Sequence, residues 1–395
     1  MGRLAVPSKE IALRIVGPRD SFFASRIQRV NLGTDYPTTD VDELGNPLHA
    51  GTTKDAPNIT FTFSAFDVSI KIFSALTGTD ATTYPGAGVD ISELGDIDAI
   101  LYIKDADVAD YVRSVHVKRL RIRDFAFSYS VEGESTEDYT AIGSKRRNFK
   151  NDVIVDKFTT GTTTFTLSET PIQLKDGNYV LSVVLDGKYL TESTGVLVTG
   201  EYSYATGDIT TFDTRVTQCL VVYHASPAGT NWSDISDSTI PAAIRGRDVK
   251  VEIGANGIDR VQSVTINGNM QPDPVREMGN REIVGYQSQV PTVEGQISVL
   301  DTDIRLIALL TTGDPDSTDT EFDVGYGCTV AGVSLEVKIY DPCDITVSGV
   351  VVKTVYIPEI EVVGDALASN VNDNVTYTFN YRSTDAQCII YSGSR

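Results

Sequence analysis

Arg26-Ile27-Gln28-Arg29-Val30 and Arg260-Val261-Gln262-Ser263-Val264 open two segments of this chain that stay in one register. Adding a constant 234 to each residue number aligns Arg26–Thr77 with Arg260–Thr311 without a gap, and 14 of those 52 positions are identical. Several identities fall on Gly and Pro, where backbone geometry restricts the residue. Chance similarity would not hold one register for this length, so the sequence predicts two copies of one domain.

Both segments give the same secondary-structure prediction. A strand at residues 27–32 or 261–266 precedes a long polar loop, and the next strand alternates apolar and polar residues, as expected when one face is buried. A short helix with an apolar residue at every third position follows, and then further strands. Each copy is therefore predicted to be a β-sandwich or small barrel with one flanking helix, and the fold class is mainly β.

A segment without a counterpart in either copy lies between them. Its short apolar runs are separated by turn sequences such as Asp176-Gly177-Asn178 and Asp186-Gly187, which predict an independent antiparallel sandwich. The predicted domains are the first copy, residues 1–152, the inserted sandwich, residues 153–238, and the second copy, residues 239–395.

Composition narrows the class of protein. The chain has 395 residues and a net charge of −21, which argues against adhesion to nucleic acid, because phosphates are neutralised by Lys and Arg. No stretch approaches the roughly 18 apolar residues of a membrane helix, and the N-terminus lacks the apolar core of a signal peptide, so a soluble cytoplasmic protein is expected. The acidic residues, mostly Asp, predict a solubilising surface; adaptation to high salt is an alternative.

Residues that commonly carry chemistry are scattered. The four cysteines form no CxxC pair, the three histidines are far apart, and Asp314–Glu321 lacks the glycine that an EF-hand loop needs. Neither a phosphate-binding loop nor a GxSxG nucleophile motif occurs. We therefore predict no catalytic residue, no metal site and no cofactor, and expect that the protein is not an enzyme.

The two long loops are the strongest candidates for a functional role. Asn31–Asn58 and Thr265–Thr292 have equal length, share Glu-x-Gly-Asn and exceed the roughly 12 to 15 residues usual for structureless loops. We expect them to dock onto another subunit and stack rings. The residues predicted for this role are Asp40, Asp42, Glu43, Gly45, Asn46, Asp273, Arg276, Glu277, Gly279 and Asn280.

One basic cluster, Lys145-Arg146-Arg147, has two interpretations. It is either a solvated segment leading into the inserted sandwich or a contact with an acidic neighbouring subunit.

The end of the first copy resembles a known family. Tyr129–Gly143, with its Gly, Thr-Glu and final Gly, is similar to the closing strands of the tail tube (major tail) proteins of tailed bacteriophages and related archaeal tailed viruses, in their duplicated form. The second copy departs from that ending, with Thr384-Asp385. The resemblance implies homotrimeric rings of pseudo-sixfold symmetry, stacked into a tube that conducts double-stranded DNA during ejection without binding it specifically.

The same resemblance implies partners and a location. The partners would be other copies of the chain and other tail proteins, with no membrane. The protein would be assembled in the host cytoplasm and belong to the virion tail. The inserted sandwich would be an immunoglobulin-like decoration that points outward.

Three alternatives stay open from the sequence. A baseplate or hub ring would use the same fold. A carbohydrate-binding cell-surface protein would fit the β-sandwiches and aromatic residues such as Tyr202, Tyr204 and Trp232, although a signal sequence is missing. A glycoside hydrolase would need a carboxylate constellation that an acidic chain cannot reveal by sequence alone.

Overall fold

The computed structural model describes residues 11–24, 26–42, 44, 51–54, 57–66, 71–78, 88–104, 111–143, 145–150, 152–159, 162–213, 218–225, 244–254, 256–258, 260–278, 283–300, 305–312, 314, 316, 318, 332–341, 349–368 and 375–395. Among these residues the protein is mainly β, with several antiparallel sheets and two short α-helices. The predicted fold class is confirmed at that level.

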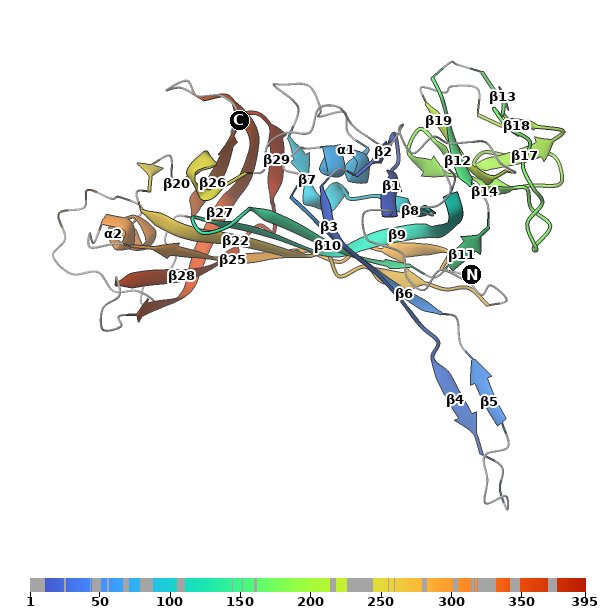
Figure 1. Ribbon diagram of the computed structural model, residues 1–395. Coiled ribbons are helices and arrows are strands. Elements are labelled where there is room, and N and C mark those ends of the chain that lie inside the picture. The colour runs from blue at the N-terminus through green and yellow to red at the C-terminus, as the bar shows by residue number, and fades with distance from the viewer. Residues whose placement is uncertain are drawn as a thin grey trace, which may run out of the picture.

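Residues of the first predicted copy form one half of a large sheet (Figure 1). Its elements are β1 (Ile11–Val16), β2 (Ser21–Phe23), β3 (Ile27–Asp35), β6 (Asn58–Ala65), α1 (Lys71–Thr77), β7 (Val89–Asp90), the 3-10 turn Ile91–Glu93, β8 (Asp96–Lys104), β9 (Tyr111–Ser130), β10 (Thr136–Gly143) and β11 (Lys145–Phe149). Pairing runs β3–β6–β10–β9. The N-terminal part of β9 pairs instead with β8 and β11, and β8 continues to β1 and β2.

The second half is built in the same order. Its elements are the 3-10 turn Gly246–Asp248, β20 (Val249–Ile253), β21 (Asn256–Gly257), β22 (Val261–Asn269), β25 (Thr292–Val299), α2 (Arg305–Thr312), β26 (Val333–Tyr340), β27 (Val351–Ala368), β28 (Thr376–Ser383) and β29 (Ile389–Ser392). Pairing runs β22–β25–β28–β27, and the N-terminal part of β27 pairs with β26 and β29. β26 continues to β20 and β21.

The two halves also share their irregularities. The β3–β6 register shifts at Ile27, and the β22–β25 register shifts at Val261, its counterpart at the offset of 234. The residue before each shift, Arg26 or Arg260, has a positive φ, 54° and 62° respectively. Local backbone geometry therefore repeats at the offset found in the sequence.

The C-terminal strands follow a second constant offset. β9–β10 and β27–β28 pair in the same register when 240 is added to each residue number of the first pair. The register skips Arg123 in the first half and Val363 in the second, which are related by the same offset of 240.

An apolar core lies under the large sheet, and the helices cover part of it. In α1, Phe73 contacts Phe125 and Phe127, with ring centroids 6.1 and 5.8 Å apart. In α2, Leu306 and Leu309 are buried in the same core. Burial of these side chains stabilises short helices that would not form alone in water.

The inserted segment contains two four-stranded sheets. Their strands are β12 (Val153–Phe158), β13 (Thr164–Thr166), β14 (Val180–Leu185), β15 (Lys188–Tyr189), β16 (Thr191–Glu192), β17 (Glu201–Ala205), β18 (Asp208–Thr211) and β19 (Cys219–His224). One sheet has the order β12–β19–β14–β15 and the other β13–β18–β17–β16. The first sheet packs through Leu181 and Val222 onto Ile100 and Tyr102 of β8, so this sandwich shares a core with the first half.

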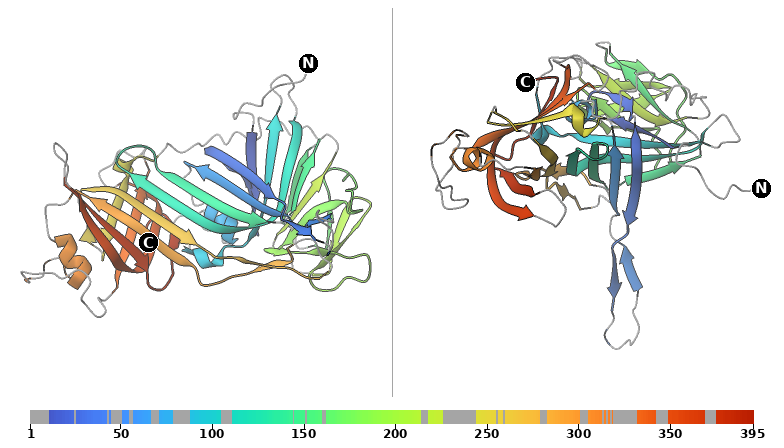
Figure 2. Two further views of the ribbon diagram at one scale, coloured as in Figure 1. Left: turned by 90° about the horizontal axis from the view of Figure 1, so that it is seen from below. Right: turned by 60° about the vertical axis from the view of Figure 1, so that its left-hand side comes forward.

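Each long loop contains a hairpin. β4 (Thr38–Val41) pairs with β5 (Gly51–Lys54), and β23 (Asp273–Val275) pairs with β24 (Gly285–Gln287), in one register at the offset of 234. We call these hairpins and their flanking residues the first arm and the second arm. The first arm extends away from the rest of the molecule, whereas the second arm lies along it (Figures 1 and 2).

No helix in the described ranges is long and apolar enough to cross a membrane.

Candidate assembly surfaces

The two halves are joined by direct strand pairing, which we call the internal junction. β22 pairs antiparallel with β9, from Ser263 opposite Ser130 to Asn269 opposite Asp124. Eight strands thus form one continuous sheet in the order β3–β6–β10–β9–β22–β25–β28–β27. The left view of Figure 2 shows the strands of both halves side by side.

Apolar packing closes the internal junction. Ile266 and Phe127 face each other and are both fully buried. Beside them, Gly268 faces Phe125, and a Cβ at this glycine would lie 2.1 Å from the Phe125 ring. The ring therefore occupies the space that a side chain at Gly268 would need.

A buried ion pair also links the halves. Lys353 of β27 donates to the carboxylate of Glu137 on β10, and both side chains are at most 1% exposed. The Tyr139 hydroxyl donates to the other Glu137 oxygen at 2.8 Å, and Lys353 Nζ lies 5.0 Å from the centroid of the Phe127 ring. A buried charge is tolerated only when it is paired, so this contact fixes the two halves relative to each other.

This ion pair could not be predicted from the sequence. Glu137 alternates in phase with Tyr139 and Ala141, and that placement on the buried face of β10 was the only available signal.

The outermost strands of the eight-stranded sheet are β3 and β27, and we call their outer sides the open edges. β3 is the counterpart of β22 and β27 is the counterpart of β9, the two strands that pair at the internal junction. Among described residues, β3 pairs only with β6, and residues 361–368 of β27 pair only with β28. Leu367 is 63% exposed, whereas its counterpart Phe127 is 0% exposed. Leu32 is partly exposed, whereas its counterpart Ile266 is 0% exposed. Residues buried at the internal junction thus have solvent-exposed equivalents at both open edges.

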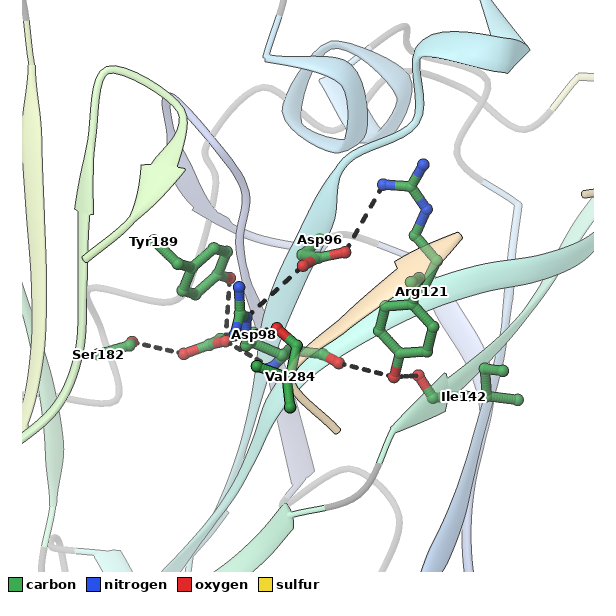
Figure 3. Close-up of polar contacts among 9 residues, drawn as sticks. Asp96, Asp98, Arg121, Ile142, Ser182, Tyr189 and Val284 are labelled. Atoms are coloured by element: carbon green, nitrogen blue, oxygen red, sulfur yellow. Dashed lines mark hydrogen bonds and ion pairs between the residues drawn. The ribbon is translucent and has the colours of Figure 1, made fainter. Parts of the chain in front are cut away.

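The second arm docks onto the first half beside Arg119. Figure 3 shows this region, with Val284 of the arm near Arg121 and Ile142 of the first half. Arg119 Nη1 donates to the carbonyl of Val284 at 2.9 Å, and Arg121 Nη2 donates to Ser288 Oγ at 3.0 Å. The Tyr286 hydroxyl lies within hydrogen-bond distance of two carbonyls, those of Arg119 at 3.1 Å and Ile142 at 2.9 Å. Burial raises the pKa of the Tyr286 hydroxyl well above its usual range. Four polar contacts therefore hold this arm.

The inserted sandwich meets the same region through Asp98. This carboxylate is fully buried and accepts from His116 Nε2 at 2.8 Å, Ser182 Oγ at 2.5 Å, Tyr189 Oη at 3.0 Å and the Arg119 backbone amide at 2.9 Å. Burial would raise the pKa of Asp98, but the His116 charge and these hydrogen bonds outweigh it and lower that pKa. Asp98 therefore connects β8 and β9 to the inserted sandwich.

The pKa of Asp96, two positions before Asp98, is shifted in the opposite direction. Burial raises its pKa, and the nearby charges of Arg119 and Arg121, whose nitrogens lie 3.6 Å from the carboxylate, do not fully compensate.

The residues predicted to stack rings fall on both arms. Asp40 and Asp42 belong to the projecting first arm, and Asp273, Arg276 and Glu277 to the second. Arg276 Nη2 donates to Asn58 Oδ1 of the same chain at 2.9 Å. The remaining predicted residues, Glu43, Gly45, Asn46, Gly279 and Asn280, lie outside the described residues.

The basic cluster has a partner within the chain. Arg147 pairs with Asp176 of the inserted sandwich, and Lys145 Nζ lies 3.7 Å from the same carboxylate. Burial raises the pKa of Asp176, but the hydrogen bond and charge of Arg147 outweigh it, so the pKa is lowered. Arg146 lies within hydrogen-bond distance of Thr34 Oγ1 and Asn148. Contact of this cluster with a neighbouring subunit stays a prediction.

Metal-ligating residues do not gather in the part of the chain that the structure describes: no three His, Cys, Asp or Glu side chains there could hold one ion.

Comparison with known proteins finds likenesses among solved structures, one of which is described here. No protein-family model and no curated protein matches the sequence. A chain of an extracellular contractile injection system, the PVC sheath-tube complex in its extended state, matches with 10% identity and a TM-score of 0.27. The match covers 38% of this chain and 93% of that chain. With this identity and TM-score, the likeness carries no functional inference.

Proposed function

We propose that this chain is the structural subunit of a tail-tube ring, in which β3 of one copy pairs with β27 of the next. Three copies would close a ring of six related halves. The internal junction is the observation that supports this proposal. There β22 pairs with β9 within one chain, and β3 and β27 are the counterparts of these two strands. Pairing of this kind removes both open edges, which would otherwise be sites of uncontrolled association.

The register of the proposed contact follows from the two offsets. At the internal junction Ile266 of β22 lies opposite Phe127 of β9. Subtracting 234 from the first residue number and adding 240 to the second places Leu32 opposite Leu367 in the proposed contact. The same arithmetic places Thr34 opposite Asp365, where the internal junction has Gly268 opposite Phe125. The side chain gained at Thr34 is thus matched by the loss of an aromatic ring at the facing position, which supports this register.

The sheet face away from the core would line the channel. It carries mainly short neutral side chains, including Thr60, Thr62, Ser128, Thr265 and Gln296. Its charged residues include five carboxylates, Asp35, Asp124, Asp138, Glu294 and Glu361, and four cations, Arg29, Arg121, Arg123 and Arg382. Three of these cations pair with carboxylates of the same face: Arg29 with Asp138, Arg123 with Asp124 and Arg382 with Glu361. A surface with more carboxylates than cations gives DNA phosphates few partners, which suits passage of a duplex without binding. Transport of viral DNA and location in a virion tail remain part of the proposal.

Disulfide trapping tests the strand contact. Asn31→Cys and Ala368→Cys face each other in the proposed register, and Cys328→Ser with Cys343→Ser would remove the two native cysteines outside the described ranges; Cys219 and Cys388 are buried. Oxidation should give covalent dimers and trimers on non-reducing gels, with no larger species if the ring closes at three. Asp35→Cys with Ala368→Cys, a pair that is out of register, should not cross-link.

Each other outcome identifies a different assembly. A ladder beyond trimers would replace the ring with an open filament, and the absence of cross-linked chains in concentrated protein would overturn edge pairing. Electron microscopy of the same material then separates a tube, seen as stacked rings, from a hub, seen as single rings.

A further inference from the structure

The buried ion pair at the internal junction has counterparts at the open edges. Lys353 donates to Glu137 and lies over the rings of Phe127 and Phe73, with Nζ 5.0 and 5.8 Å from their centroids. The cation comes from the half that contributes β22 to the junction, and the carboxylate and both rings come from the half that contributes β9. A contact of the same kind between two copies would set a cation of the half that carries β3 against the half that carries β27.

The cation has a counterpart in Arg113, at the offset of 240. Ile103 lies opposite Arg113 in the first half and Ile339 lies opposite Lys353 in the second, and a register shift directly follows each pair. Lys353 is 0% exposed, whereas Arg113 is exposed and forms no hydrogen bond or ion pair through its side chain with another described residue. Arg113 therefore carries on the surface the charge that is buried at the internal junction.

The second half also has a carboxylate at the corresponding place, but on the neighbouring strand. Adding 240 to Glu137 gives Tyr377 on β28, and adding 240 to Phe125 gives Asp365 on β27. The carboxylate and the aromatic ring have thus exchanged strands. The Tyr377 hydroxyl donates to Asp365 Oδ2 at 2.7 Å, as the Tyr139 hydroxyl donates to Glu137 at 2.8 Å. A tyrosine hydroxyl orients the carboxylate in both places.

Apolar side chains complete the counterpart site. Leu367 stands where the first half has Phe127, and Ile307 stands where it has Phe73. Leu367 is 63% exposed, and Ile307 packs partly buried against the core. These two side chains can cover the methylene groups of an arginine while its guanidinium reaches a carboxylate. The Asp365 carboxylate is exposed, and its only polar partner among the described residues is Tyr377.

We infer that Arg113 of one copy forms an ion pair with Asp365 of the next, with the arginine methylenes on Leu367. This inference rests on the proposed function, since pairing of β3 with a neighbour's β27 brings Arg113 to the open edge of that neighbour. In a free subunit both charged groups are exposed to water, so they cost the fold little. Assembly would cover them, and a covered ion pair in one register disfavours every other register, which would leave each charge without a partner.

Carbodiimide coupling tests the contact directly, because it joins an amine to a carboxylate without a spacer. Arg113→Lys keeps the positive charge and supplies the amine. Rings closed by the disulfide between Asn31→Cys and Ala368→Cys would be coupled, digested and analysed by mass spectrometry. We expect a link between position 113 and Asp365 of different chains, shown to be intermolecular by mixing isotopically labelled and unlabelled protein. Asp365→Asn should abolish the link, and the exposed amine of Lys175 on the inserted sandwich should not couple to Asp365.

Charge exchange gives a second, quantitative test. Arg113→Ala or Asp365→Asn should raise the subunit concentration needed for half-maximal ring formation by about tenfold or more, measured by sedimentation. Arg113→Asp combined with Asp365→Arg should recover most of the assembly that either change alone abolishes. Thermal unfolding of the free subunit should be unchanged in all of these variants, because both side chains are exposed there. Lys175→Glu changes the charge of an exposed residue elsewhere and should not affect assembly.

The outcomes separate this inference from the proposed function. Disulfide-closed rings that give no coupling at position 113, together with normal assembly of Arg113→Ala, would overturn the ion pair and leave the strand contact intact. Coupling of position 113 to a different carboxylate of the neighbour would overturn the assignment of Asp365. Failure of Asn31→Cys and Ala368→Cys to cross-link with Arg113 and Asp365 unchanged would overturn the proposed function and the ion pair with it.

Discussion

The internal junction and the open edges are formed by corresponding strands, which are paired at the junction and unpaired on one side at the edges. At the internal junction, Phe127 and Ile266 are fully buried and Gly268 leaves room for a ring. At the open edges the corresponding residues are smaller or polar, as at Asp365 and Thr34. Folding buries the first contact permanently, so it tolerates aromatic residues. In the proposed ring, polar groups on the second contact would keep a free subunit from associating indiscriminately before assembly.

Removing the Lys353 charge from the buried ion pair with Glu137 should have the largest effect on the free energy of unfolding. Lys353→Met leaves Glu137 as an unpaired carboxylate in the core, and we expect a loss of about 3–5 kcal/mol in the free energy of unfolding. Urea denaturation followed by circular dichroism measures this loss. Lys353→Met combined with Glu137→Leu removes both charges and should recover most of it; equal losses in the single and double variants would show that packing, and not the unpaired charge, is responsible.

The glycine at the internal junction, Gly268, can be replaced by the residue that its counterpart has at the open edge. Gly268→Thr introduces the residue found at the open edge and forces it against the Phe125 ring, so we expect a loss of about 1–3 kcal/mol from overpacking. Thr34→Ala is the matched change on the open edge and should alter the stability of the free subunit by less than about 0.5 kcal/mol. Thermal unfolding of both variants checks the difference, and similar losses would contradict it.

The sequence was sufficient to predict a mainly β fold, because alternation of apolar and polar residues along a strand is a local pattern. It was not sufficient to predict the full length of β27. This strand runs from Val351 to Ala368, through an irregularity at Val363. Gly364-Asp365 resembles a turn in isolation, and only its pairing with β28 keeps it extended.

The contacts at the candidate assembly surfaces were still harder to predict, because they join residues that are far apart in the sequence. Equal loop lengths predicted a docking role, but they did not indicate that Tyr286 would bind carbonyls of Arg119 and Ile142 in the same chain. The Asp98 network likewise needs the inserted sandwich to be placed on β8 before its partners, Ser182 and Tyr189, can be recognised.

The insertion gives a further contrast between the halves, which pH can test. Ser334 stands in the second half where Asp98 stands in the first, at the corresponding register shift. The pKa of Asp98 is lowered on folding, so its stabilisation is present above its ordinary value of 3.8 and is lost as the pH falls below that value. Asp98→Asn should reduce the free energy of unfolding at pH 7 by about 1–3 kcal/mol. The difference from the unmodified protein should shrink below pH 3.8, and a constant difference down to pH 2 would exclude Asp98 as the titrating group.

The smallest expected effect concerns the two arms themselves. In the free subunit, backbone amides of the docked second arm should exchange with deuterium more slowly than those of the projecting first arm. Tyr286→Phe removes hydrogen bonding to two carbonyls and should increase exchange at residues 283–288, at a cost of about 0.5–1.5 kcal/mol in local stability. Tyr36→Phe, a change at a 61% exposed residue at the base of the first arm, should leave that exchange unchanged. Unchanged exchange at residues 283–288 in Tyr286→Phe would show that the two carbonyl contacts do not hold the second arm.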